Sequence, residues 1–282
     1  MSSEICLLYL VWIPLGLEPV KKFLASYLSY DHGVGHKLLI VFNGHSDALQ
    51  LTEYQSLVEN IPHEEIIIPH SGFDIESYRI AGSQQASKFI CFLNSYSEIL
   101  MPGWLALMQH HLSRPGVGAV GASGNLISWH TSLVTDWEQD KTHTKYSGPV
   151  GGIRLRLRRA LYRAMFPPFP NPHLRTNAFL IPRDVFLSLR YWPRFGKLDT
   201  YRFESGRTGM TRQIQAKGLK VLVVGKDGRG YPPEEWAESH TFWQENQENL
   251  LVADNQTRRF AAADEVTRRG LTRIAWSDPA RV

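Results

Sequence analysis

The sequence predicts an α/β protein in which helices cover both faces of a central, mostly parallel sheet, giving three layers. Apolar runs of strand length alternate with stretches of helical periodicity along the first half of the chain. Residues 89–93 are apolar throughout, as expected of a parallel strand buried on both faces, and a polar cluster follows them directly. The 282 residues, of which 43% are apolar and 21% charged, are sufficient for one large core.

The predicted elements of the first half follow one another as βαβ units. Residues 7–12 form an apolar run that Pro14 and Gly16 close, and residues 19–30 have apolar side chains at helical spacing before the next apolar run at 38–42. The same patterns predict a helix at 48–60, a strand at 66–68, a helix at 75–87, a strand at 89–93, a helix at 104–112 and a strand at 117–122.

Ligands of open parallel sheets bind beyond the carboxyl ends of the strands. This rule places four polar segments around one crevice. They are residues 12–15, 43–47, 70–74 and 94–98. The sequence therefore predicts a binding site at this edge of the sheet.

The second half of the chain is less regular. Residues 129–152 are polar and contain glycine, which predicts a mobile loop, and residues 153–166 form a strongly basic amphipathic helix. Four prolines within 167–172 exclude a helix there and predict a stiff connector. The remaining predictions are a strand at 179–181, helices at 184–189 and 209–217, a strand at 221–224 and a helical tail after about residue 250.

Composition excludes several classes of protein. The sequence has no run of about 18 uncharged apolar residues, and its two cysteines, Cys6 and Cys91, lie in apolar runs, which favours buried thiols in a reducing compartment. We therefore expect a cytoplasmic protein. The net charge of +4 is mild, and no DNA- or RNA-binding motif accompanies it, so we expect no nucleic-acid partner.

Residues 89–104 resemble the centre of family 2 glycosyltransferases of the GT-A fold. In that family a buried strand ends in an Asp-x-Asp type motif, and a Pro-Gly-Trp turn follows. Here Asn94, Ser95 and Tyr96 occupy the place of the acidic motif, and Glu98 is the nearest carboxylate. The resemblance implies a Rossmann-like sheet, with Asn94 to Glu98 beside the diphosphate and the donor sugar.

Two earlier segments are similar to the nucleotide-binding part of the same family. The run at 38–47 keeps the family's second acid as Asp47 but has Asn43 for the first, and an amide can still bond a base edge. The segment at 71–79 contributes Asp74, and Arg79 where the family prefers a neutral amide. The resemblance implies that these four residues hold the nucleotide. For Arg79, an exposed helix arginine is the alternative interpretation.

The family's acidic motif binds Mg²⁺ or Mn²⁺ through carboxylate oxygens, which neutralises the departing diphosphate. Without those anions no cofactor is firmly implied, and Glu98 and His240 are the remaining candidate ligands. The alternative is a route without a metal, in which arginines and lysines stabilise the diphosphate.

Segments further along the chain predict the residues that bind the acceptor. Residues 172–181 resemble the loop and strand that shape this side of the fold, with Arg175 and Asn177 facing the crevice, and Trp236 is a candidate for stacking on a sugar. Residues 197–206 are similar to the family segment whose acid removes the acceptor proton. This assigns Glu204 as base, with Asp199 second. An acid at a helix N-terminus is the alternative for Glu204.

The resemblance implies an inverting, hexosyltransferase-like enzyme of polysaccharide biosynthesis that moves a sugar from a nucleotide-sugar donor to a glycan or lipid-linked acceptor. It implies a main domain at 1–250, with a nucleotide-binding half at about 1–125 and an acceptor half at about 126–250, and a helical tail at 251–282. The basic helix from Arg154 to Arg163 predicts contact with anionic lipid at the inner face of a membrane, or else a core stripe with a solvated basic face. A non-catalytic carbohydrate- or nucleotide-binding protein is the alternative function.

Overall fold

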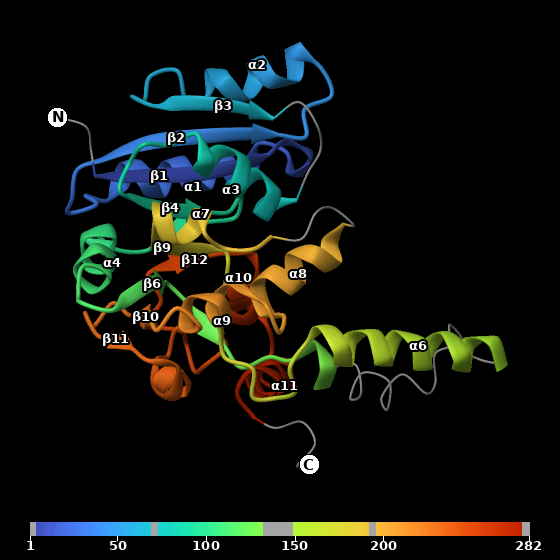
Figure 1. Ribbon diagram of the computed structural model, residues 1–282. Helices are drawn as coiled ribbons and strands as arrows, with labels where there is room; N and C mark the ends of the chain where they lie inside the picture. Colours follow the sequence, from blue (N-terminus) through green and yellow to red (C-terminus); the bar gives the residue numbers. More distant parts are fainter. Residues whose placement is uncertain (1–3, 69–72, 132–148, 192–195, 278–282) are drawn as a thin grey trace.

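The computed structural model describes residues 4–68, 73–131, 149–191 and 196–277. Its centre is an eight-stranded sheet in the order β11-β10-β6-β9-β4-β1-β2-β3 (Figure 1). The strands are β1 (Ile5–Trp12), β2 (His36–Asn43), β3 (Glu64–Ile68), β4 (Phe89–Leu93), β6 (Val117–Gly121), β9 (Ala178–Pro182), β10 (Lys220–Val224) and β11 (Gly230–Tyr231).

The sheet is mostly parallel. β1 pairs in parallel with β2 and β4, β2 with β3, and β6 with β10. β9 is antiparallel to both β4 and β6, between which it lies, and β11 is antiparallel to β10. The loop that leads into β9 therefore arrives at the edge where β4 ends, because antiparallel neighbours run in opposite directions.

Helices cover both faces because the strands alternate apolar side chains between two cores. Leu7 and Tyr9 pack into one cluster with α1 (Glu18–Ser29), α2 (Ala48–Ser56) and α4 (Trp104–Leu112). Cys6 and Leu8 pack into the other, which the opposite helices complete. These are α3 (Asp74–Ser83), α7 (Arg183–Leu187), α8 (Lys197–Ser205) and α9 (Met210–Gln215). The predicted three-layer α/β class is confirmed.

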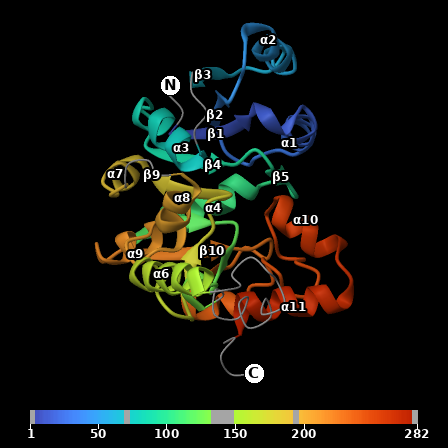
Figure 2. The same cartoon turned by 90° about the vertical axis from the view of Figure 1, so that its right-hand side faces the viewer.

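The C-terminal segment packs onto the body through short strands and a third apolar cluster. β12 (Val252–Ala253) pairs antiparallel with β5 (Glu98–Ile99), directly after the polar turn that ends β4. α10 (Asn255–Ala262) and α11 (Glu265–Trp276) follow, and Figure 2 shows α10 just below β5. The third cluster contains Phe242, Trp243, Phe260, Leu271 and Ala275. Residues 254–258 are thereby held at the carboxyl edge of the sheet.

A long helix departs from this body. α6 (Pro149–Met165) extends outward on the side toward which β2 and β3 point, as Figure 1 shows. Two further short strands, β7 (Gly124–Asn125) and β8 (His173–Leu174), pair antiparallel near its C-terminal end. Within the described ranges, no helix is long and apolar enough to cross a membrane.

Most predicted elements are present, and the differences have local causes. The strand at 89–93 and the helix at 104–112 have the predicted bounds, whereas α2 and α3 end four residues early, at Ser56 and Ser83. α8 was not predicted as a helix, because its sequence from Lys197 to Ser205 is mostly polar and lacks a strong apolar stripe. Of the predicted loop at 129–152, residues 132–148 lie outside the described residues, and residues 149–152 belong to α6.

Candidate functional site

A cavity of about 550 Å³ lies between α8 and the C-terminal segment. Two stacked aromatic pairs contribute to its walls. Trp129 stacks on Tyr201 and Phe242 on Trp243, each pair with ring centroids 4.5 Å apart. Polar and charged side chains complete the lining together with a few apolar ones. The lining also includes Asn125, Ile127, His173, Arg175, Glu204, Ser205, Gln256, Arg259, Leu271 and Ile274.

α8 positions Glu204 in this cavity. One carboxylate oxygen, Oε1, accepts a hydrogen bond from the backbone N–H of Thr176 at 3.3 Å. Burial raises the pKa of Glu204 to about 7; the guanidinium of Arg175 opposes this rise, and the negative charge of Asp74 adds to it. Near neutral pH the side chain is therefore divided between its two protonation states, as a general base requires. The interpretation of Glu204 as an acid of a helix N-terminus is wrong, because it lies in the last turn of α8.

A second carboxyl group lies within electrostatic reach of Glu204. Asp74 is the first residue of α3, and its Oδ1 accepts from the N–H of Ile75 at 2.9 Å. Burial raises the pKa of Asp74 to about 6, with the backbone N–H and the charge of Lys197 acting in the opposite direction. The two carboxyl groups therefore interact electrostatically, although Asp74 does not line the cavity that contains Glu204.

Asp199, the second candidate base, does not line the cavity. It is buried in the first turn of α8, and its Oδ1 lies 3.4 Å from Nη1 of Arg202 one turn later. The geometry therefore favours Glu204 over Asp199 as the group that meets a ligand.

Arg175 is fixed at the cavity wall by a buried ion pair. Its Nη2 lies 2.5 Å from Oδ2 of Asp254, Nη1 donates to Oγ of Ser123 at 3.3 Å, and the guanidinium carbon lies 4.2 Å from the centroid of the Phe242 ring. The side chain of Arg175 is 10% exposed and that of Asp254 is 1% exposed. The positive charge beside Glu204 is thus held rigidly by a residue 79 positions further along the chain.

The turn that replaces the acidic motif closes on itself. Oδ1 of Asn94 accepts from the N–H of Tyr96 at 3.0 Å and from Oγ of Ser97 at 3.2 Å. Oγ of Ser95 accepts from the N–H of Trp12 at 3.0 Å, which ties the turn to the end of β1. The side-chain oxygens of Asn94 and Ser95 are therefore engaged in hydrogen bonds within the protein.

A guanidinium lies directly beside this turn. Nη1 of Arg258, from α10, donates to the backbone oxygen of Tyr96 at 3.2 Å and to Oε2 of Glu98 at 3.0 Å. The nearest carboxylate is thus already paired with a cation, and hard carboxylate oxygens are what Mg²⁺ and Mn²⁺ require. The residues at this turn do not fit a divalent metal site.

His240, the other candidate metal ligand, belongs to a different group. Its ring nitrogen and the carboxylates of Glu245 and Glu248 lie within 4.8 Å of one another, and Glu98 is not part of this group. The predicted combination of Glu98 with His240 is therefore not formed.

Neither of the two cavities described in this section is lined by all four predicted nucleotide residues. Asn43 ends β2 fully buried, and its Nδ2 donates to Oγ of Ser77 at 2.6 Å, so its amide is committed within the protein. Asp47 is exposed and caps α2 by accepting from the N–H of Gln50. Of the four, Asp74 is the one whose charge acts on Glu204. Residues 70–72 of this predicted region lie outside the described residues.

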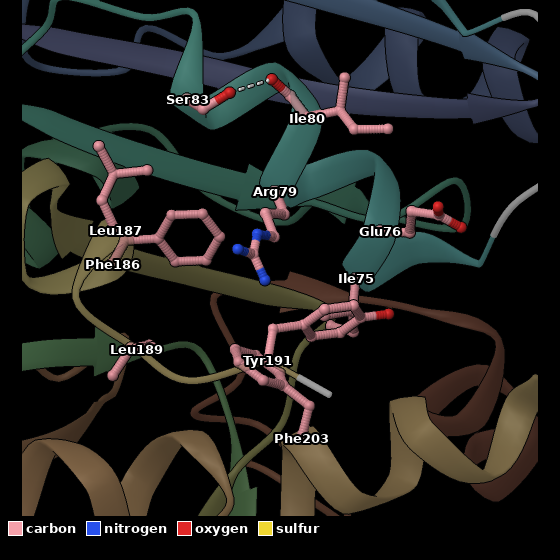
Figure 3. Close-up of a pocket in the computed structure, with 10 residues that line it drawn as sticks. All are labelled: Ile75, Glu76, Arg79, Ile80, Ser83, Phe186, Leu187, Leu189, Tyr191 and Phe203. Atoms are coloured by element: carbon pink, nitrogen blue, oxygen red, sulfur yellow. Dashed lines mark hydrogen bonds between the residues drawn. The ribbon is translucent and has the colours of Figure 1, made fainter. Parts of the chain in front are cut away.

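Arg79 lines a different cavity, of about 650 Å³, between α3, α7 and α8. Figure 3 shows its side chain directed from α3 toward the ring of Tyr191, and the guanidinium carbon lies 5.6 Å from the ring centroid. Apolar residues such as Ile75, Phe186 and Phe203 make up much of the lining. This cavity lies on a helix-covered face of the sheet, so the structure does not place Arg79 beside Asn43.

Two of the three predicted acceptor residues do not line the cavity. Trp236 is fully buried, donates from Nε1 to the backbone oxygen of Tyr231 at 2.9 Å, and packs on Gly124, where an added Cβ would lie 2.8 Å from the indole. Its assignment as an acceptor residue is therefore wrong, because no sugar can reach the ring. Asn177 is also buried, and its backbone oxygen accepts from the N–H of Asn94, so it fastens two loops together.

Several residues of the site were not predicted from the sequence, and four of them matter for its chemistry. Asp254 and Arg258 lie in the segment expected to be a tail, and their pairing with Arg175 and Glu98 leaves no mark in the sequence. Trp129 lies at the start of the expected loop. Tyr201 precedes Glu204 by three positions, so a helix prediction for this segment would have placed both on one face.

No protein-family model matches the chain, and no curated protein sequence matches it. Among solved structures, the chain is similar to the mannosyltransferase PcManGT from Pyrobaculum calidifontis in complex with GDP-Man and Mn²⁺, with a TM-score of 0.50 and 11% identity over 85% of this chain and 60% of that chain. It is also similar to TarS 1-349 of S. aureus in complex with UDP-GlcNAc, with a TM-score of 0.32 and 13% identity over 43% of this chain and 33% of that chain.

The chain thus spans 60% of the length of the mannosyltransferase. At this level of identity the likeness concerns the fold. It confirms the GT-A-type α/β fold that the sequence predicted.

Proposed function

We propose that this protein is a glycosyltransferase that uses a nucleotide-sugar donor and an inverting mechanism, with Glu204 as the base. The observation that carries the proposal is a carboxyl group of pKa about 7 in an aromatic-walled cavity at the carboxyl edge of a GT-A-type sheet. Active sites are where burial and neighbouring charges shift a pKa toward the working pH. Asp199 stays the second candidate for the base.

The reaction assigns a simple role to Glu204. Its carboxylate takes the proton of an acceptor hydroxyl, the acceptor oxygen forms a bond to the anomeric carbon, and the bond from that carbon to the diphosphate oxygen breaks. Attack from the side opposite the leaving group inverts the anomeric centre. The Thr176 N–H donates to the carboxylate, and the Arg175 charge favours its ionised form.

In this proposal Arg258 supplies the positive charge that a divalent cation would otherwise supply. It brings a permanent positive charge to the turn from Asn94 to Tyr96, which is where the family places its metal-binding acids. A guanidinium presents several N–H donors that match the geometry of phosphate oxygens. The negative charge that develops on the leaving diphosphate is then stabilised without a metal.

The acceptor occupies the 550 Å³ cavity. Rings such as Tyr201 and Trp243 offer apolar faces to a sugar, and Arg175 and Arg259 supply positive charge. A glycan or a lipid-linked glycan fits this chemistry. Three points stay predictions from the sequence. They are a hexose as the transferred sugar, a place in polysaccharide biosynthesis and a cytoplasmic location.

The direct test is release of nucleoside diphosphate from a panel of UDP-, GDP- and dTDP-sugars, in the presence and absence of EDTA. GDP-mannose belongs in the panel because the similar mannosyltransferase was solved with GDP-Man. We expect release that EDTA does not abolish and that Glu204→Gln removes, while thermal stabilisation by the nucleoside diphosphate persists. Turnover by Glu204→Gln would remove Glu204 from the role of base.

The closed turn at Asn94 favours a second candidate, a protein that binds nucleotides or carbohydrates without catalysis. Such a protein would be stabilised by ligands of the same panel but would release no diphosphate with any of them. The wild-type protein alone, assayed with all donors, decides between the two functions.

A further inference from the structure

α6 carries a stripe of exposed apolar side chains. Ile153, Leu157 and Leu161 are 58%, 66% and 49% exposed, although side chains of this kind are normally buried. Their spacing of four residues places them along one face of the helix, and the exposed Ala160 and Ala164 widen that face. We call these five residues the α6 stripe.

Arginines border the stripe. At 100° per residue, Arg156 and Arg163 project on one side of it and Arg158 on the other, and all three are exposed. The sequence of α6 contains five arginines and no Asp or Glu. An exposed apolar stripe between two cationic borders is the arrangement of a helix that lies in a membrane interface.

The position of α6 suits such a contact. The helix extends away from the body on the side toward which β2 and β3 point, where Figure 1 shows it reaching beyond the sheet. Its C-terminal end is anchored, because the N–H of Arg207 donates to the oxygen of Met165 at 2.8 Å and the Arg207 guanidinium bonds the oxygen of Arg163. Arg207 follows Glu204 by three residues, so the anchor adjoins the acceptor cavity.

We propose that the α6 stripe docks on the surface of a bilayer that contains anionic lipid. The apolar side chains enter the boundary between headgroups and acyl chains, and the bordering arginines remain among the phosphates. The proposal stands independently of sugar transfer.

The charge of α6 argues against two other partners for the α6 stripe, namely a second copy of the chain and a nucleic acid. A second copy would bring the exposed Arg156 and Arg163 of one helix toward the same residues of the other, which opposes association. A nucleic acid would use the arginines but would leave the leucines in water. Only a surface that is both anionic and apolar satisfies both features of the helix.

The test is flotation of the full chain with vesicles of phosphatidylcholine alone and of phosphatidylcholine mixed with phosphatidylglycerol. We expect binding to the mixed vesicles only. Leu157→Asp should weaken that binding about 10- to 100-fold, as the burial of one leucine predicts. Arg156→Gln should weaken it about fivefold and make it less sensitive to salt. The matched control is Leu49→Asp, because Leu49 is 84% exposed on α2, outside the stripe, and should change nothing.

Three results would overturn the proposal. One is equal weakening by Leu157→Asp and Leu49→Asp, with both variants folded by circular dichroism. Another is an absence of binding to either kind of vesicle. The third is self-association or oligonucleotide binding that Leu157→Asp abolishes, which would assign the stripe to a second copy or to nucleic acid.

Discussion

Replacing Glu204 by Gln should remove activity and at the same time stabilise the protein, with a pH dependence fixed by the structure. Burial raises the pKa of this carboxyl from 4.5 to about 7. At 1.36 kcal/mol for each pH unit, the ionised form destabilises the folded state by about 3 kcal/mol. Gln has the same shape and its Oε1 can still accept the N–H of Thr176, but it carries no charge to bury.

The sign and the pH window follow from the direction of the shift. Below pH 4.5 the carboxyl is protonated in both the folded and the unfolded chain, so wild type and Glu204→Gln should be equally stable. Between pH 4.5 and about 7 the unfolded chain releases the proton and the folded chain keeps it, and wild type loses stability progressively. Above about pH 7 the difference should level off near 3 kcal/mol, in favour of the variant.

The assay is urea unfolding of both proteins across this pH range, alongside donor turnover. Wild-type turnover should rise with pH through about 7, as Glu204 becomes the free base, and the variant should lose about 100- to 10,000-fold in kcat. Glu238→Gln, on an exposed carboxyl, is the control and should alter neither property. A difference in stability between wild type and Glu204→Gln that did not depend on pH would refute the reasoning.

Three further predictions concern the charges and rings around Glu204. Arg258→Ala should lower kcat/KM for the donor about 100-fold and Arg258→Lys less, whereas Arg269→Ala on exposed α11 should leave steady-state kinetics unchanged. Asp254→Asn keeps the cap of α10 but leaves the Arg175 charge buried alone, so denaturant unfolding should show a loss of about 3–5 kcal/mol. The control is Asp264→Asn, at the exposed cap of α11, which should lower the free energy of unfolding by less than about 1 kcal/mol. Equal losses in the two variants would show that the ion pair of Arg175 with Asp254 does not stabilise the fold. Tyr201→Ala should raise the acceptor KM about tenfold while Tyr201→Phe, which keeps the ring, should not; similar KM values for both would exclude stacking.

The sheet and its helices were predictable because their signals are local. A run such as Phe89–Leu93 can be satisfied only by burial on both faces, and Trp104–Leu112 has both helical spacing and a Pro-Gly start. α8 was not predicted as a helix because its own apolar pattern is weak. Tertiary contacts, mainly those of Phe203, stabilise it.

The site was only partly predictable, since its chemistry depends on contacts between distant segments. Glu204 was found through its resemblance to a family segment, and the structure gives it the burial and pKa that suit a base. Asn43 and Trp236 were chosen for what their side chains can do, but each is used within the protein. Whether a polar or aromatic group faces a ligand is decided by packing, which the residue type alone does not encode.

The pairing of Arg175 with Asp254 has a consequence for synthesis on the ribosome. A nascent chain released as far as Asn249 already contains the whole central sheet and Glu204, but neither Asp254 nor Arg258. Burying the guanidinium of Arg175 without its counter-ion would be costly, so the cavity should stay open and hydrated until α10 is synthesised. Formation of the pocket would therefore follow formation of the sheet during synthesis.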